Sequence, residues 1–278
     1  QIDWECDVHR MYQEKNYGCD PSEFISQKWA FSVVDKCIVL EDDDVPSVSF
    51  FSFCKEMLDI YENDERVSMI AGFNPEEVTS DMPYDYFFAT TFSIWGWASW
   101  RRVLDQWDEH YTFLDDEFNM KKMRSRIKAH KYRSDLIYRC QRHREHGKAF
   151  YETIFESSFV FNSGLSIVPA RNMINNLGAI GNSTHYGSSL DIMPQGLRRI
   201  FTMKRYEIEA PLKHPLYVME DVDYKERIFR IMGWDHPWIK VSRSFEELYL
   251  NIKCGNFSNI TKSLTHRIQK WLKIDQHN

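Results

Sequence analysis

The sequence predicts an α/β protein with a mostly parallel sheet, flanking helices and a helical C-terminal region. A short apolar run over residues 37–40 is typical of a strand buried on both faces. Apolar residues at helical spacing follow between residues 50 and 61. A second short apolar run covers residues 67–71. Strand, helix and strand at this spacing favour parallel strands joined by a crossover helix.

Further elements are expected on both sides of this unit. Asp20 followed by Pro21 and Glu23 predicts the start of a helix, with Asp20 as the N-cap. The chain reads as extended over residues 86–92 and returns to helical spacing from Trp97. The remaining predicted elements are two helices within 115–147, a helix over 150–161 and a strand over 165–168.

The chain is expected to divide near Met203. Residues 1–203 would form the sheet domain, and residues 204–278 would form the helical appendage, because short helices punctuated by His-Pro pairs replace the strand pattern there. With 35 Lys+Arg against 41 Asp+Glu and a net charge of −6, the composition gives no case for nucleic-acid binding.

The composition also bears on location. Residues 87–100 are free of charge but too short and too polar to span a membrane, and the first residues do not have the pattern expected of a signal peptide. The six cysteines are scattered and form no CxxC pair, which favours reduced thiols in a cytoplasmic protein.

Four consecutive acids, Glu41, Asp42, Asp43 and Asp44, follow the carboxyl end of the first predicted strand. Ligands of parallel α/β sheets bind beyond this end of the strands. Crowded carboxylates repel unless a cation lies among them, and oxygen ligands favour Mg²⁺ or Mn²⁺. The alternative is a solvated acidic turn before the next helix.

Three other stretches are candidates for the same site. Trp95-Gly96-Trp97 offers flat aromatic faces on which a sugar ring can stack, or fills a corner of the core. Glu152 lies among aromatic residues at a predicted helix start, where it is either a general base or an ordinary first-turn acid. His185, in a loop rich in Gly, Asn and Ser, is either a metal ligand or an ordinary loop histidine.

Five segments together carry a resemblance. They are IVLEDDDVPSVSFF, WGWASW, the Tyr151-Glu152 segment, SIVPARNMINNLG and STHYG, in this order. Over residues 29–187 the chain resembles the bacterial haemolysin-like glycosyltransferases of the HlpA type. It is more distantly similar to the Golgi N-acetylglucosaminyltransferase I family. The resemblance implies a GT-A fold, a Rossmann-like sheet that binds a nucleotide-sugar and holds Mn²⁺ or Mg²⁺ at an acidic strand end.

The resemblance also implies roles for residues. Asp43 would ligate the metal directly, and His185 would lie near the metal and the diphosphate. Glu41 and Asp42 would face the nucleoside side of the donor. Glu152 would deprotonate the acceptor hydroxyl, and the Trp95-Gly96-Trp97 stretch would line the sugar and acceptor pocket.

The sequence departs from the family in two places. The family's first βα unit, which grips the base, precedes the region that matches residues 4–19, so we expect only part of it in this chain. Glu152 also stands where the related bacterial proteins more often have Asp, which extends the predicted base by one methylene.

The expected reaction is a metal-dependent, inverting transfer of a sugar from a nucleotide-sugar, expected to be a UDP-sugar, to a glycan or a lipid-linked acceptor. The alternatives are a nucleotidyltransferase, which should show a glycine-rich phosphate loop that we do not find, and a non-catalytic carbohydrate-binding protein on the same fold.

The C-terminal segment 260–274 combines basic residues with apolar residues at helical spacing. Such a helix can lie on the inner membrane surface as a peripheral contact. The alternative is packing against the protein itself or a second subunit of a homo-oligomer, which Asp275 and the shortness of the stretch favour.

Overall fold

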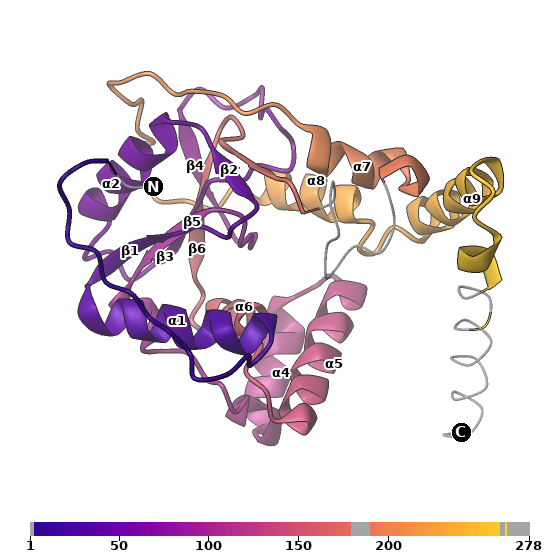
Figure 1. The fold of residues 1–278 in the computed structure, drawn as a ribbon, viewed down its shortest axis with the longest axis horizontal. Coiled ribbons are helices and arrows are strands. Elements are labelled where there is room, and N and C mark those ends of the chain that lie inside the picture. The colour runs from indigo at the N-terminus through magenta and orange to yellow at the C-terminus, as the bar shows by residue number, and fades with distance from the viewer. Residues whose placement is uncertain (1–2, 179–189, 262–264, 266–278) are drawn as a thin grey trace.

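The computed structural model describes residues 3–178, 190–261 and 265. Its centre is a five-stranded sheet whose strands run in the order β1-β5-β3-β6-β4 (Figure 1). These strands are β1 (Lys36–Val39), β3 (Val67–Ala71), β4 (Tyr86–Ala89), β5 (Trp97–Trp100) and β6 (Leu165–Pro169). A separate two-stranded ribbon pairs β2 (Asp44–Pro46) with β7 (Ile174–Asn176).

The sheet is mixed, so the expectation of a mostly parallel sheet is corrected. Only β3 and β6 pair in parallel, whereas β5 is antiparallel to both β1 and β3, and β4 is antiparallel to β6. β1 and β3 do run in the same direction, as the strand–helix–strand pattern predicts, but β5 lies between them. The carboxyl ends of β1, β3 and β6 therefore share one edge, together with the start of β5.

Strand β5 corrects a second expectation, because helical spacing was predicted from Trp97 onward. The Trp97 ring faces Phe31 and Phe155 at 6.3 Å and 5.0 Å between ring centroids. Trp100 donates its indole N–H to the Leu58 carbonyl at 3.1 Å. The two rings thus reach opposite faces of the sheet, as residues an odd number apart do in a strand.

Helices cover both faces of the sheet (Figure 1). α2 (Ser49–Ile60) packs on the face that carries Trp100, with Phe50, Phe53 and Met57 buried. On the opposite face lie α1 (Cys19–Val33), α6 (Tyr151–Phe161) and α8 (Val222–Met232). α1 begins without the predicted Asp20 cap, since Gly18 occupies the N-cap position and no side chain caps the helix.

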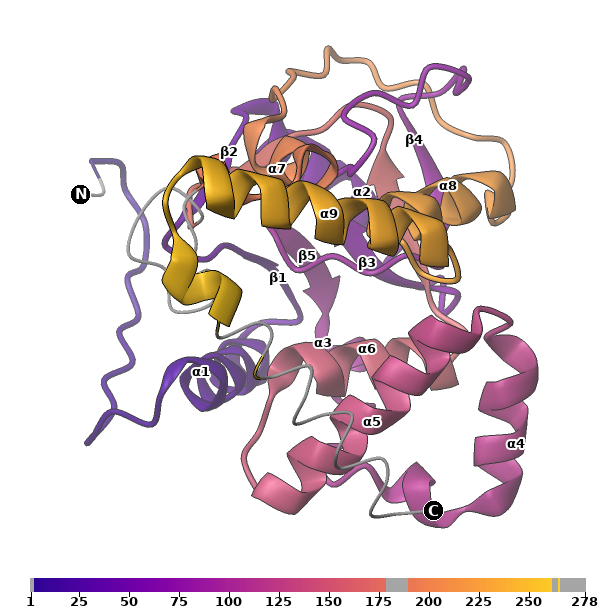
Figure 2. The same ribbon diagram turned by 90° about the vertical axis from the view of Figure 1, so that its right-hand side faces the viewer.

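The remaining helices form two groups (Figure 2). α4 (Glu117–Arg126) and α5 (His130–His146) pack near α6 around a second apolar core, after the short α3 (Arg101–Leu104) and the 3-10 turn η1 (Thr112–Asp115). The other group lies near α8 and consists of the turn η2 (Leu190–Ile192), α7 (Gln195–Thr202) and α9 (Pro237–Lys253). Among the described residues, no helix is both long and apolar enough to cross a membrane.

Candidate functional site

The four acids do not share one environment. Asp42 is exposed, whereas Glu41, Asp43 and Asp44 are half-buried. Only Asp42 therefore behaves as a solvated turn residue would. The chain turns sharply after β1, and Asp44 then opens β2 opposite Asn176. This turn holds the acids at the edge of the sheet where β1 and β3 end.

Asp44 is fixed to the glycine of the Trp95-Gly96-Trp97 stretch. Its Oδ2 accepts the Gly96 N–H at 2.8 Å and the Glu41 N–H at 3.2 Å. Burial raises the pKa of the Asp44 carboxyl to about 6, although these two hydrogen bonds oppose the rise. The turn that follows β1 and the turn that precedes β5 are thereby held together.

Gly96 occupies a position that favours glycine. Its φ of +55° lies in the left-handed region. A Cβ built on Gly96 would lie 2.5 Å from Cδ1 of Ile174 and 3.3 Å from Cδ2 of Leu40. The side chain of Ile174, on β7, sits where a side chain of residue 96 would go.

Asp43 is held by a residue that the sequence did not single out. Asn176 donates from Nδ2 to Asp43 Oδ1 at 2.6 Å and, more weakly, to Asp44 Oδ1 at 3.4 Å. The Leu177 N–H donates to the Asp43 carbonyl at 2.9 Å. Asn176 lies within the SIVPARNMINNLG segment, but nothing in that segment identifies Asp43, 133 residues away, as its partner.

Glu41 is tied to α6. The Tyr151 hydroxyl donates to Glu41 Oε1 at 2.6 Å, and Tyr151 is fully buried. Burial raises the pKa of the Glu41 carboxyl to about 8, which the Tyr151 hydrogen bond opposes. The sequence placed Tyr151 beside the predicted base but gave it no role. In the structure it connects the acidic turn to the first turn of the helix that carries Glu152.

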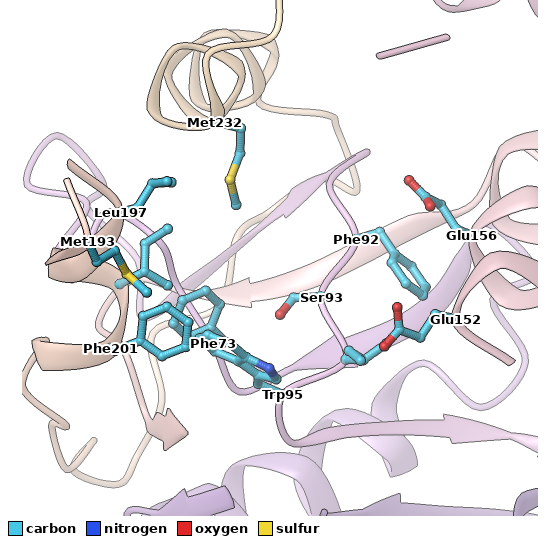
Figure 3. Close-up of a pocket in the computed structure, with 12 residues that line it drawn as sticks. Phe73, Phe92, Ser93, Trp95, Glu152, Glu156, Met193, Leu197, Phe201 and Met232 are labelled. Atoms are coloured by element: carbon cyan, nitrogen blue, oxygen red, sulfur yellow. The ribbon is translucent and has the colours of Figure 1, made fainter. Parts of the chain in front are cut away.

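Glu152 and Trp95 line one pocket of about 280 Å³ (Figure 3). The pocket opens among α6, the segment before β5, and helices α7 and α8. Each of these two residues is the chain neighbour of a residue bonded to an acid: Trp95 precedes Gly96, and Glu152 follows Tyr151. None of the four acids lines the pocket, and the acidic turn is linked to it through these two hydrogen-bonded neighbours.

Glu156, one helical turn after Glu152, also lines the pocket. Its carboxylate is held by neighbouring side chains. Its Oε1 accepts the Tyr132 hydroxyl at 2.7 Å, and its Oε2 pairs with Arg139 at 2.6 Å. Glu156 is only 7% exposed. Both of its oxygens are therefore engaged in joining α5 to α6.

Trp97 was expected to line the pocket, but it does not. It is fully buried in the core against Phe31 and Phe155, so its ring offers no surface to a ligand in this conformation. The tryptophans of the WGWASW segment thus divide, with Trp95 at the pocket and Trp97 and Trp100 in the core.

Of the two expected metal ligands, Asp43 lies within the described residues. His185 lies outside the described residues. Within the described ranges, no three His, Cys, Asp or Glu side chains are grouped to hold a metal ion by themselves. Mg²⁺ is commonly bound by one or two carboxylates together with substrate phosphates. Adjacent, half-buried Asp43 and Asp44 provide oxygen donors of that kind, so their chemistry fits a hard cation shared with a diphosphate.

A scan of the chain against protein-family models gives no match, and a search of curated proteins gives none either.

Proposed function

We propose that the protein is a metal-dependent, inverting glycosyltransferase that uses a nucleotide-sugar donor, expected to be a UDP-sugar. The observation that supports this best is the meeting of three features at one sheet edge. The acidic turn after β1, the aromatic turn at Trp95 and the Glu152 end of α6 are joined there by the Gly96–Asp44 and Tyr151–Glu41 hydrogen bonds.

In this proposal the acidic turn receives the diphosphate of the donor. Asp43 would hold Mn²⁺ or Mg²⁺, with Asp44 beside it, and the bound ion would neutralise charge on the leaving diphosphate. Glu41 and Asp42 would face the nucleoside. Asn176 would keep the Asp43 carboxylate oriented through its 2.6 Å hydrogen bond.

Glu152 would act as the general base. An acceptor hydroxyl gives its proton to the Glu152 carboxylate, and its oxygen forms a bond to the anomeric carbon. The bond from that carbon to the diphosphate oxygen breaks, and the nucleoside diphosphate leaves with the electron pair. Glu156 is the poorer candidate for this role because Arg139 and Tyr132 engage both of its oxygens.

A donor assay tests the proposal. The full chain is incubated with a panel of nucleotide-sugars, with and without Mn²⁺, and thermal shift and release of free nucleoside diphosphate are measured. The proposal expects one donor to raise the unfolding midpoint only when metal is present, with slow hydrolysis of that donor. If no nucleotide-sugar binds under either condition, the proposal fails.

Release of pyrophosphate from a nucleoside triphosphate would instead identify a nucleotidyltransferase. Binding of free sugars without any donor binding would identify a carbohydrate-binding protein.

A further inference from the structure

One end of the Glu152 pocket is a continuous apolar wall (Figure 3). It is formed by Phe73, Trp95, Met193, Leu197, Phe201 and Met232. The aromatic rings are packed against each other, with Phe73 to Trp95 at 4.7 Å and Trp95 to Phe201 at 5.2 Å between centroids. These residues come from four separate segments of the chain, so the wall is a product of the fold and not of one apolar stretch.

The opposite end of the pocket carries Glu152 and Glu156 together with Phe92 (Figure 3). The polar side chains that line it among the described residues are Ser93, Glu152 and Glu156. Tyr132 and Arg139 already engage both oxygens of Glu156. A sugar ring buried along the apolar wall would lose hydrogen bonds from most of its hydroxyls, and each such loss is unfavourable.

We propose that this pocket binds the apolar group of the acceptor. The acceptor would be an alkyl or aryl glycoside, or an alcohol of similar apolar character. Its hydrophobic aglycone would contact Trp95, Leu197 and Phe201, and its attacking hydroxyl would point to Glu152. This inference rests on the proposed transferase function, because it assigns the ligand as an acceptor, and it separates acceptors with an apolar aglycone from free oligosaccharides.

The test measures binding without donor or metal. Methyl, butyl and hexyl β-glucoside and phenyl β-glucoside are titrated into the full chain by calorimetry, below the concentrations at which they form micelles. Each methylene that leaves water for the apolar wall should tighten binding about fourfold, from roughly 0.8 kcal/mol per buried CH₂. Stronger binding of phenyl than of butyl glucoside indicates an aryl aglycone. Continued gain through hexyl indicates an alkyl chain, as in a lipid-linked acceptor.

Two variants locate the effect. Leu197 and Leu212 are both partly buried leucines that pack on the main core, but only Leu197 lines the pocket. Leu197→Asn should remove most of the gain from methyl to hexyl glucoside, whereas Leu212→Asn should keep it. Equal affinities for methyl and hexyl glucoside in the unmodified chain would overturn the inference, as would equal effects of the two variants.

The outcome is independent of the donor assay. If no nucleotide-sugar binds, the transferase is rejected. Affinity that still rises with the length of the alkyl group would then show an apolar ligand site. A transferase that turns over a donor but binds methyl and hexyl glucoside equally would keep its proposed function and lose this assignment of the acceptor.

Discussion

At the scale of single residues, Glu152 and Glu156 are one helical turn apart and occupy different environments. Glu152→Gln is nearly isosteric, so it should preserve donor binding and lower turnover by about 10²–10⁴-fold, the usual contribution of a general base. Glu156→Gln should instead lower the unfolding midpoint, because it leaves the part-buried Arg139 without its charged partner. Steady-state turnover and thermal unfolding of both variants check this, and normal turnover in Glu152→Gln would contradict it.

Asp43 is expected to be the main protein ligand of the metal. Asp43→Asn keeps the shape of the side chain and removes its charge, so the fold should persist while Mn²⁺-dependent binding of a nucleoside diphosphate is lost. Glu65→Gln is the charge-matched control, because Glu65 is an exposed acid at the amino end of β3, away from the site. Calorimetric titration with and without Mn²⁺ gives the result, and an unchanged metal dependence in Asp43→Asn would reject the assignment.

Gly96 combines two constraints that a pair of variants separates. Gly147 has a similar left-handed φ of +64°, but a Cβ there would meet nothing within 4 Å, whereas at Gly96 it would meet Ile174. Gly147→Ala should therefore show only the backbone strain, about 1 kcal/mol. Gly96→Ala should lower the free energy of unfolding by clearly more, since Ile174 or the turn must move. Urea unfolding measures both, and equal losses would show that Ile174 yields freely.

The residues that the sequence identified and those it missed differ in one physical respect. Glu152, Trp95 and the acids stand out because of their composition and their place in predicted elements. Tyr151 and Asn176 act through partners 110 and 133 residues away in the chain. Local patterns carry no information about such contacts, because only the folded chain creates them.

At the scale of elements, β5 shows most clearly where the spacing of apolar residues fails to distinguish a strand from a helix. Trp97, Trp100 and Leu104 are spaced as on one face of a helix, yet β5 ends at Trp100 and α3 begins at Arg101. A central strand is apolar on both faces, so its residues fit either period. By contrast, the predicted helix over 150–161 is confirmed as α6, because its longer apolar pattern cannot be accommodated by a short strand.

The packing of α5 against α6 gives a prediction for pH. His143 stacks on Phe150 at 3.8 Å, and burial, together with Arg139 and His146, lowers its pKa while Asp20 opposes this. The folded state thus favours neutral His143. The stabilisation that neutral His143 gives is complete above the pKa of histidine in the unfolded chain, near 6.5. It is lost as the pH falls from there through the lower pKa of His143 in the folded state. His143→Phe should flatten the fall in unfolding free energy below about pH 6.5.

The control for this prediction is His110→Phe, because His110 is exposed. It should leave the pH dependence unchanged. Urea unfolding at a series of pH values between about 7.5 and 4.5 compares the variants with the unmodified chain. If His143→Phe loses stability on acidification as steeply as the unmodified chain does, the histidine does not stay neutral in the folded state.

At the scale of the whole molecule, the direction of β1 and β3 follows from the sequence, but the neighbours of each strand do not. β5 enters the sheet between them from a later part of the chain, and strand order is set by packing across the whole domain. The placement of the acids at the carboxyl end of β1 survives this difference, because the antiparallel β5 begins at the same edge.

Residues after Met203 make close contacts with the sheet domain. Glu207 accepts the backbone N–H groups of Val48 and Ser49 at 3.0 Å and 2.7 Å, at the start of α2. The Asp221 N–H donates to the Phe88 carbonyl of β4 at 2.7 Å. These contacts bear directly on whether 204–278 unfolds as a separate region.

Tyr224, on α8, is the residue through which this coupling can be measured. It is fully buried, its ring lies 4.6 Å from that of Phe87 on β4, and its hydroxyl donates to Asn74 Oδ1 at 3.2 Å. Tyr224→Ala should lower the free energy of unfolding by about 3–5 kcal/mol, as expected for removal of a buried aromatic ring. Tyr224→Phe loses only the hydroxyl and should lower it by about 1 kcal/mol.

The measurement follows urea unfolding by far-ultraviolet circular dichroism and by hydrogen exchange of the α8 amides. Because α8 and β4 share a buried interface, both probes should report one transition, and Tyr224→Ala should move both midpoints together. Tyr217→Ala is the control, since Tyr217 is 72% exposed, and it should move neither. If α8 exchanges before the sheet unfolds and Tyr224→Ala leaves the main midpoint in place, residues 204–278 form the separate region that the sequence predicts. A joint shift would instead make them part of the structure that holds the Glu152 pocket, because Met232 at the end of α8 forms one side of its apolar wall.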